Sequence, residues 1–206
     1  MLGFYNYTVI LTYVGMLSGF AGVAAALDGR INASLICLII AGVCDMFDGK
    51  IAATRERTRQ EKRFGVQIDS LSDLICFGAL PAVIVYAGTV GRLRLMPCML
   101  YVLSALIRLA WFNVDEEERQ DREGDRRRVY YGLPVTSAAA AIPLVMWLCA
   151  GRPGAAKWVA PLMLLVMAAL FLTPVPIRKP AFRNRMSALL LCATASALAA
   201  MAGTLL

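Results

Sequence analysis

Seven apolar stretches, most of them close to the roughly 20 residues that a membrane-spanning helix needs, divide this chain of 206 residues. They lie near residues 8–27, 31–53, 67–91, 95–113, 132–150, 156–173 and 186–206. Because hydrocarbon offers the backbone no hydrogen-bond partners, such stretches cross a bilayer as helices. A hydrophobic content of 59% and a mean hydropathy of +0.64 fit the same class. The sequence predicts an all-α polytopic membrane protein with a single transmembrane domain over residues 1–206.

The basic residues predict how the spans are oriented. Fifteen of the 21 Lys and Arg residues lie between the second and third, the fourth and fifth, and the sixth and seventh apolar stretches, if Lys50 near the end of the second stretch is included. The positive-inside rule therefore places these connections and the N-terminus in the cytoplasm. The polar stretch 113–132 is expected to form a solvated loop. A net charge of +7 is accounted for by anionic lipid head groups, and no nucleic-acid motif is visible, so we expect no nucleic-acid partner.

Four aspartates interrupt the second and third apolar stretches. Asp45 and Asp48 are three residues apart, and Asp69 and Asp73 are four apart, so each pair shares one face if both segments are helical. Carboxylates at membrane depth are costly and usually functional. Four of them together need a strong cation, and an all-oxygen ligand set suits Mg²⁺, Mn²⁺ or Ca²⁺ rather than Zn²⁺. The alternative is that they are helix caps or interfacial charges.

The chain contains no histidine, and its six cysteines include no CxxC pair. The lack of histidine excludes Ser-His and Cys-His catalytic arrangements and zinc or haem sites that need His. The cysteine pattern does not favour a disulfide framework or a zinc site. Any proton transfer therefore falls to a carboxylate.

The segment from Asp45 to Asp73 resembles the signature of the CDP-alcohol phosphotransferases, which reads D-x-x-D-G-x-x-A-R, a spacer, and G-x-x-x-D-x-x-x-D. The matching positions are Asp45, Asp48, Gly49, Ala52, Gly65, Asp69 and Asp73. Two departures stand out. Ala53 occupies the place of the family's arginine, and the spacer before Gly65 is longer than usual. Arg55 or Arg57 is expected to take over the contact that the missing arginine would make.

Other segments resemble the phosphatidylserine synthases of the bacterial integral-membrane type within this family. They are NYTVILTY, GVQIDSLSDLICFGALPA, RLAWFN, YYGLPVTSAA and PIRKP. The resemblance implies a six-helix catalytic core over residues 1–180, commonly in a homodimer, with an additional C-terminal span at 186–206. It also implies a multi-pass protein of the bacterial inner membrane, with its active site near the cytoplasmic interface.

This resemblance implies transfer of the phosphatidyl group of CDP-diacylglycerol to L-serine, giving phosphatidylserine and CMP. The cofactor would be Mn²⁺ or Mg²⁺, as two ions, with Ca²⁺ as an inhibitory or structural ion. Its expected ligands are Asp45, Asp48, Asp69 and Asp73, of which Asp73 also acts as the base. The expected CDP-diacylglycerol-binding residues are Asp48, Gly49, Ala52, Arg55, Arg57, Gly65 and Asp69.

An amino-acid substrate brings a carboxylate of its own, for which an arginine fork is a suitable partner. Arg108 is the candidate inside a predicted span, and snorkelling to the interface is its alternative role. Side chains such as Ser137 could add neutral hydrogen bonds. The expected serine-binding residues are Arg108, Asn113, Thr136, Arg178 and Lys179.

Alternative functions follow from the same residues. Within the family, glycerol 3-phosphate or inositol phosphate could be the acceptor, although either would call for more basic residues around the acceptor. A divalent-cation transporter is the alternative from another class, but the carboxylates gather at one end of the predicted spans. A membrane scaffold would leave the aspartate pattern unexplained.

Overall fold

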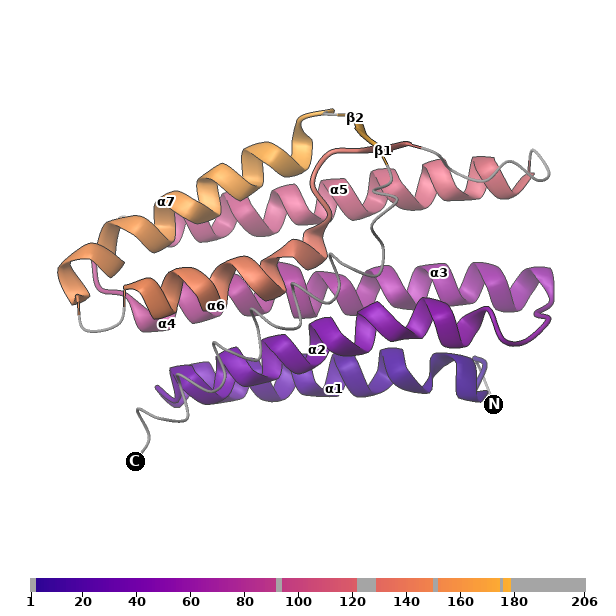
Figure 1. The fold of residues 1–206 in the computed structure, drawn as a ribbon, viewed down its shortest axis with the longest axis horizontal. Coiled ribbons are helices and arrows are strands. Elements are labelled where there is room, and N and C mark those ends of the chain that lie inside the picture. Colours follow the sequence, from indigo (N-terminus) through magenta and orange to yellow (C-terminus); the bar gives the residue numbers. More distant parts are fainter. Residues whose placement is uncertain (1–2, 92–93, 122–128, 150–151, 175, 179–206) are drawn as a thin grey trace.

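A bundle of long helices makes up nearly all of the computed structural model, which describes residues 3–91, 94–121, 129–149, 152–174 and 176–178 (Figure 1). A π-helical segment, η1 (Leu74–Ala79), joins two helices into one rod, and a 3₁₀ turn, η3 (Val135–Ser137), precedes another. The α-helices are α1 (Tyr7–Leu27), α2 (Ile31–Ala52), α3 (Arg59–Asp73), α4 (Leu80–Gly88), α5 (Leu95–Asp121), α6 (Ala138–Leu148) and α7 (Pro153–Leu172). The predicted all-α fold is confirmed.

Five of these helical segments are long and apolar enough to cross a membrane, namely 7–27, 31–52, 59–88, 95–118 and 154–172. A sixth apolar segment, Val135–Leu148, is shorter. Large apolar side chains such as Leu17, Phe20 and Leu162 are more than 60% exposed, as expected of a surface that faces lipid tails. The chain is therefore a multi-pass membrane protein. The predicted span 186–206 lies outside the described residues.

Two expected boundaries are wrong. The third apolar stretch was expected to begin at residue 67, but its helix begins at Arg59, because Thr58 and Glu61 form a capping box there. The first part of the stretch 113–132, which was expected to form a solvated loop, is helical instead, because α5 continues to Asp121. Charged residues are good helix formers, so both helices extend past the end of the apolar sequence.

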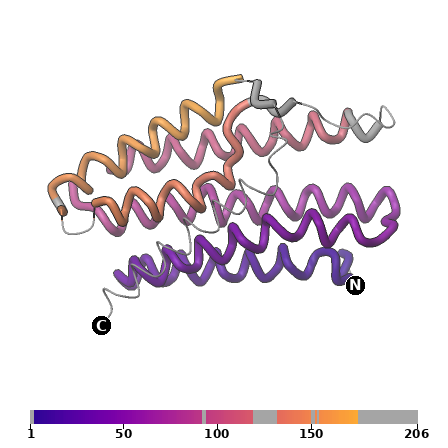
Figure 2. The backbone as a smooth tube through the Cα atoms, viewed as in Figure 1, coloured from indigo at the N-terminus to yellow at the C-terminus, as the bar shows by residue number. Residues whose placement is uncertain are grey.

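The rod formed by α3, η1 and α4 lies in the middle of the bundle (Figures 1 and 2). Helices α1 and α2 lie along one side of it, and α5 and α7 pack together on the other. Phe77, Leu80 and Ile84 of the rod are almost completely buried and share one core with Tyr101 of α5 and Phe171 of α7. The rod therefore has a fixed position between the two helix pairs.

A short antiparallel pair of strands joins the segment that precedes α6 to the segment that follows α7. Strand β1 (Val129–Tyr131) pairs with β2 (Pro176–Arg178), with Val129 opposite Arg178. The sequence analysis did not predict this pair.

Glycines on one face of α1 bring α2 and the central rod close together. A Cβ at Gly19 would lie 2.5 Å from Cys76 Sγ, and one at Gly22 would lie 2.9 Å from Cys37 Cβ. Small residues allow such close backbone contact between membrane helices. As a result, the carboxylates on α2 and on α3 face one another across a narrow gap.

Candidate metal centre and adjoining cavities

The four aspartates come together between α2 and α3. One carboxylate oxygen from each of Asp45, Asp48 and Asp69 lies within 4.8 Å of the other two. Asp73 is outside this group of three, but its carboxyl group faces that of Asp45, just as Asp48 faces Asp69. The two aspartates of α2 therefore lie opposite the two aspartates of α3.

These residues fit a divalent metal ion. All four aspartates line a small cavity of about 10 Å³, about the space needed for one water-sized particle. Within the described part of the chain, no lysine or arginine forms an ion pair with any of them. Mutual repulsion of partly buried carboxylates is relieved by a cation, and oxygen donors suit hard ions such as Mg²⁺ and Mn²⁺.

Thr12 of α1 extends the site to a third helix. Its Oγ1 donates a hydrogen bond of 3.2 Å to Asp48 Oδ2, and Asp48 is only 9% exposed. The hydroxyl of Ser72 in turn donates to the Thr12 carbonyl oxygen at 3.5 Å. Helix α1 therefore orients Asp48 and is linked by hydrogen bonds to both aspartate-bearing helices.

A cavity of about 410 Å³ opens beside the aspartates, at the end of the bundle where α2 connects to α3. It is lined by six of the seven expected CDP-diacylglycerol-binding residues, namely Asp48, Gly49, Ala52, Arg57, Gly65 and Asp69. The seventh, Arg55, is not part of the lining. Arg57 Nη1 lies 3.2 Å from the position that a Cβ of Gly65 would occupy, so the side chain of Arg57 lies along α3. Arg55 instead forms an ion pair with Glu61 at 3.8 Å.

A second cavity, of about 240 Å³, lies between α2 and the segment that contains η3 and the start of α6. Asp45 lines it together with Thr136 and Ser137 of η3. Most of its remaining lining is apolar or small, including Gly42 and Ala139. Thr136 is therefore the one expected serine-binding residue that the described structure places in a cavity with one of the aspartates.

The other expected serine-binding residues lie elsewhere. Arg108 lines a separate cavity of about 470 Å³ between α5 and α7, with Trp111 and Phe171. Asn113 links α5 to α3, because its Oδ1 accepts a hydrogen bond of 2.6 Å from Ser70 and its Nδ2 donates to Gln67 at 3.2 Å. Arg178 lies in β2, and its side chain is outside the described part. Lys179 is likewise outside the described residues.

Several residues of the large cavity were not predicted as site residues. Those with polar side chains are Thr8, Thr12, Lys62 and Glu116. The two threonines belong to the segment NYTVILTY, whose resemblance to relatives was visible without any role attached to it. Lys62 is one of a cluster of basic residues, and its spacing does not separate it from the others. Glu116 comes from α5, beyond the predicted end of that span.

These features describe a multi-pass membrane protein with four carboxylates gathered between two of its helices. The family of CDP-alcohol phosphatidyltransferases matches residues 5–175, and this chain belongs to it. The family predicted from the aspartate signature is therefore confirmed.

Individual relatives carry more specific names. The archaetidylserine synthase of Methanothermobacter thermautotrophicus is 32% identical over 135 residues, which cover 65% of this chain and 54% of the relative. The CDP-diacylglycerol–serine O-phosphatidyltransferase of Saccharomyces cerevisiae is 32% identical over 142 residues, covering 63% of this chain and 50% of the relative. The enzyme of that name from Helicobacter pylori is 30% identical over 115 residues, which cover 54% of this chain and 45% of the relative. The chain spans about half the length of these curated relatives.

Proposed function

We propose that this protein transfers the phosphatidyl group of CDP-diacylglycerol to L-serine, giving phosphatidylserine and CMP. The observation that carries the proposal is the position of the four aspartates around one cavity of about 10 Å³. Asp48 and Asp69 also line the cavity of about 410 Å³, and Asp45 lines the cavity of about 240 Å³. The relatives named as serine phosphatidyltransferases support serine as the acceptor.

The large cavity suits the donor substrate. Its diphosphate is anionic, and Arg57 and Lys62 provide positive charge in the lining. Gly49 has no described atom within 4 Å of a built Cβ, so this part of α2 leaves room for the nucleotide. The cavity also reaches Asp48 and Asp69, so a diphosphate bound there would lie beside the candidate metal centre.

The aspartates would hold the metal and move the proton. Two divalent ions would balance the charge of the four carboxylates, and the ions would polarise the phosphorus and neutralise the charge developing on the diphosphate. Asp73 accepts the proton of the serine hydroxyl. The serine oxygen then forms a bond to the phosphorus next to diacylglycerol, and the bond from that phosphorus to CMP breaks.

The second cavity, of about 240 Å³, suits the acceptor. It lies against Asp45, which faces Asp73, so a hydroxyl held there would be close to the base. Thr136 and Ser137 offer hydroxyl groups to a small polar substrate. The described lining contains no lysine or arginine, which favours serine over an acceptor that carries a phosphate.

Orientation, boundaries and assembly belong to the same proposal. The basic connection between α2 and α3 lies at the aspartate end of the bundle, which supports a cytoplasmic active site and a cytoplasmic N-terminus. We assign residues 1–180 to the catalytic core and 186–206 to an additional span, with a homodimer as the working assembly. The bacterial inner membrane is the proposed location.

The test is the identity of the lipid product. Purified protein is incubated with CDP-diacylglycerol and Mn²⁺, and with L-serine, glycerol 3-phosphate or inositol phosphate in parallel, and the extracted lipids are identified by mass spectrometry. The proposal requires phosphatidylserine in the serine reaction. A phosphatidyl product formed only with another acceptor would refute serine specificity.

A further inference from the structure

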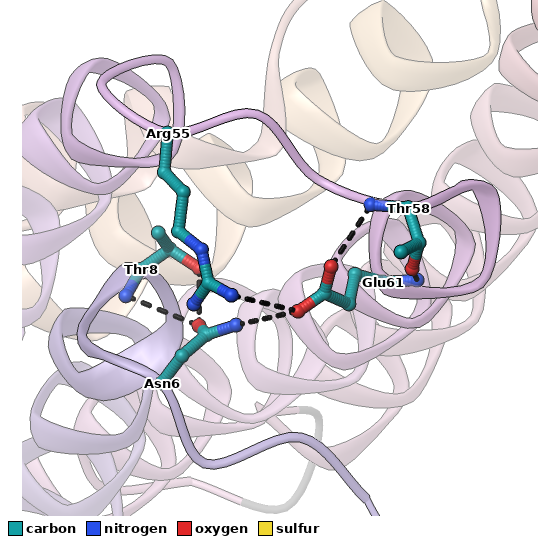
Figure 3. Close-up of polar contacts among 5 residues, drawn as sticks. All are labelled: Asn6, Thr8, Arg55, Thr58 and Glu61. Atoms are coloured by element: carbon teal, nitrogen blue, oxygen red, sulfur yellow. Dashed lines mark hydrogen bonds and ion pairs between the residues drawn. The ribbon is translucent and has the colours of Figure 1, made fainter.

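The starts of α1 and α3 are joined by one carboxylate, that of Glu61 (Figure 3). Glu61 Oε2 accepts a hydrogen bond of 2.9 Å from the backbone N–H of Thr58, and the Glu61 N–H donates to Thr58 Oγ1 at 3.2 Å. These two bonds form the capping box of α3. The other carboxylate oxygen, Oε1, accepts a hydrogen bond of 3.0 Å from Asn6 Nδ2.

Asn6 suits this double role because of its amide group. Its Oδ1 caps α1 by accepting from the backbone N–H of Thr8 at 3.3 Å and from the Thr8 hydroxyl. Its Nδ2 remains available to donate to Glu61. Serine, threonine or aspartate would cap α1 about as well. Among these residues, only asparagine also offers an N–H donor to a neighbouring carboxylate.

The loop between α2 and α3 is fastened at both ends by these contacts. Arg55 Nη2 lies 3.8 Å from Glu61 Oε1, and Thr58 is held by the capping box. The hydroxyls of Tyr7 and Thr54 lie 3.2 Å apart and add a contact to α1. Arg57 sits between the two fastened positions. In the described part of the chain it forms no ion pair, so its place in the cavity depends on the backbone that carries it.

We propose that Glu61 is a positioning residue for substrate binding. Together with Asn6, Arg55 and Thr58 it forms the Glu61 bridge, which holds the loop so that Arg57 points into the large cavity against the diphosphate of the donor. The inference rests on the proposed function, because the diphosphate is the ligand that Arg57 contacts. It assigns a role in substrate binding to the segment before α1.

Two single substitutions break the bridge without removing a helix cap. Asn6→Asp keeps an oxygen acceptor for Thr8, but replaces the Nδ2 donor with an oxygen that repels Glu61. Glu61→Gln keeps a residue compatible with the capping box, but Asn6 and Thr58 bind different oxygens of Glu61, and the glutamine replaces one of these oxygens with an NH₂ donor. We expect each variant to raise the KM for CDP-diacylglycerol about tenfold, as expected for loss of one hydrogen bond to a charged group. The kcat should stay near that of the wild type.

The double variant Asn6→Asp with Glu61→Gln restores the hydrogen bond between positions 6 and 61, with the donor and the acceptor exchanged. The amide of the introduced glutamine can donate to the carboxylate of the introduced aspartate, while the glutamine oxygen accepts from Thr58. We therefore expect the KM to return close to the wild-type value. Asp28→Asn is the matched control, because it breaks an exposed ion pair of 2.9 Å with Arg30 at the other end of α1 and should leave the KM unchanged.

Limited trypsin digestion of the same proteins in detergent gives a second readout, since cleavage after Arg55 and Arg57 reports on the loop. We expect faster cleavage in both single variants and wild-type cleavage in the double variant. Single variants with wild-type KM, or a double variant no better than the worse single, would overturn the inference. Failure of the proposed function would look different, because the wild type itself would then release no CMP.

Discussion

Replacing Gly42 with alanine should force α2 away from α6. A Cβ built on Gly42 would lie 2.6 Å from Ala139 Cβ, whereas carbon atoms pack best at about 3.5–4.0 Å. Ala139 Cβ cannot rotate away, so the two helices must separate by about 1 Å to restore that spacing. Overpacking of this kind costs about 1–3 kcal/mol. Removing a glycine from a helix returns up to about 1 kcal/mol. We expect a net loss of about 1–2 kcal/mol in the free energy of unfolding.

The Gly42→Ala change should also lower activity. Asp45 lies one turn further along α2, and both residues line the cavity of about 240 Å³ that we assign to the acceptor. Stability is measured by reversible unfolding in mixed micelles and activity by CMP release. Gly42→Ala combined with Ala139→Gly removes the facing methyl group and should recover most of both losses. Gly154→Ala is the control, since no described atom lies within 4 Å of its built Cβ. A Gly42→Ala protein as stable as the wild type would falsify the close packing of α2 on α6.

Three further predictions concern single side chains. Asp69→Asn should abolish CMP release yet leave a folded protein that, with EDTA present, unfolds at no lower temperature than the wild type, since one repelling charge is removed; substantial turnover would count against a role for Asp69 in metal binding. Arg57→Gln should raise the KM for CDP-diacylglycerol about tenfold, because Arg57 lines the cavity proposed for this substrate. Arg55→Gln should raise it by much less, because it breaks only an exposed ion pair, which contributes about 0.2–1 kcal/mol. Equal effects of the two substitutions on the KM would contradict the different places of the two arginines. Tyr101→Phe removes a buried hydroxyl that donates to the Phe77 carbonyl oxygen at 2.6 Å, so it should cost about 1–3 kcal/mol of stability in the unfolding assay, and an unchanged value would mean that this bond contributes nothing.

Local sequence patterns were sufficient to predict five membrane spans and the aspartate group. The spacings Asp45–Asp48 and Asp69–Asp73 place each pair on one helix face, and the structure brings three of these carboxylates within ligand distance. The start of α3 was also readable, because Thr58 and Glu61 have the spacing of a capping box. The hydropathy pattern placed the start of this helix too late, because the first turns of α3 are strongly charged.

Contacts between distant segments could not be predicted in this way. Arg55 and Arg57 are equivalent in spacing arguments, and only the structure separates their roles, because Arg55 pairs with Glu61 while Arg57 lines the large cavity. Arg108 looked like a partner for a substrate carboxylate, but the packing of α5 on α7 places it in a different cavity from the aspartates. Thr12 gave no chemical signal of its own, because its role depends on the close approach of α1 to α2.

The most direct test of the central claim is CMP release from CDP-diacylglycerol by the purified protein, with Mn²⁺ and L-serine each present or absent. The four aspartates around one small cavity, between a donor cavity and an acceptor cavity, predict release only when both metal and serine are supplied. CMP release that persists in EDTA, or that proceeds equally well without serine, from protein shown to be folded, would contradict the account.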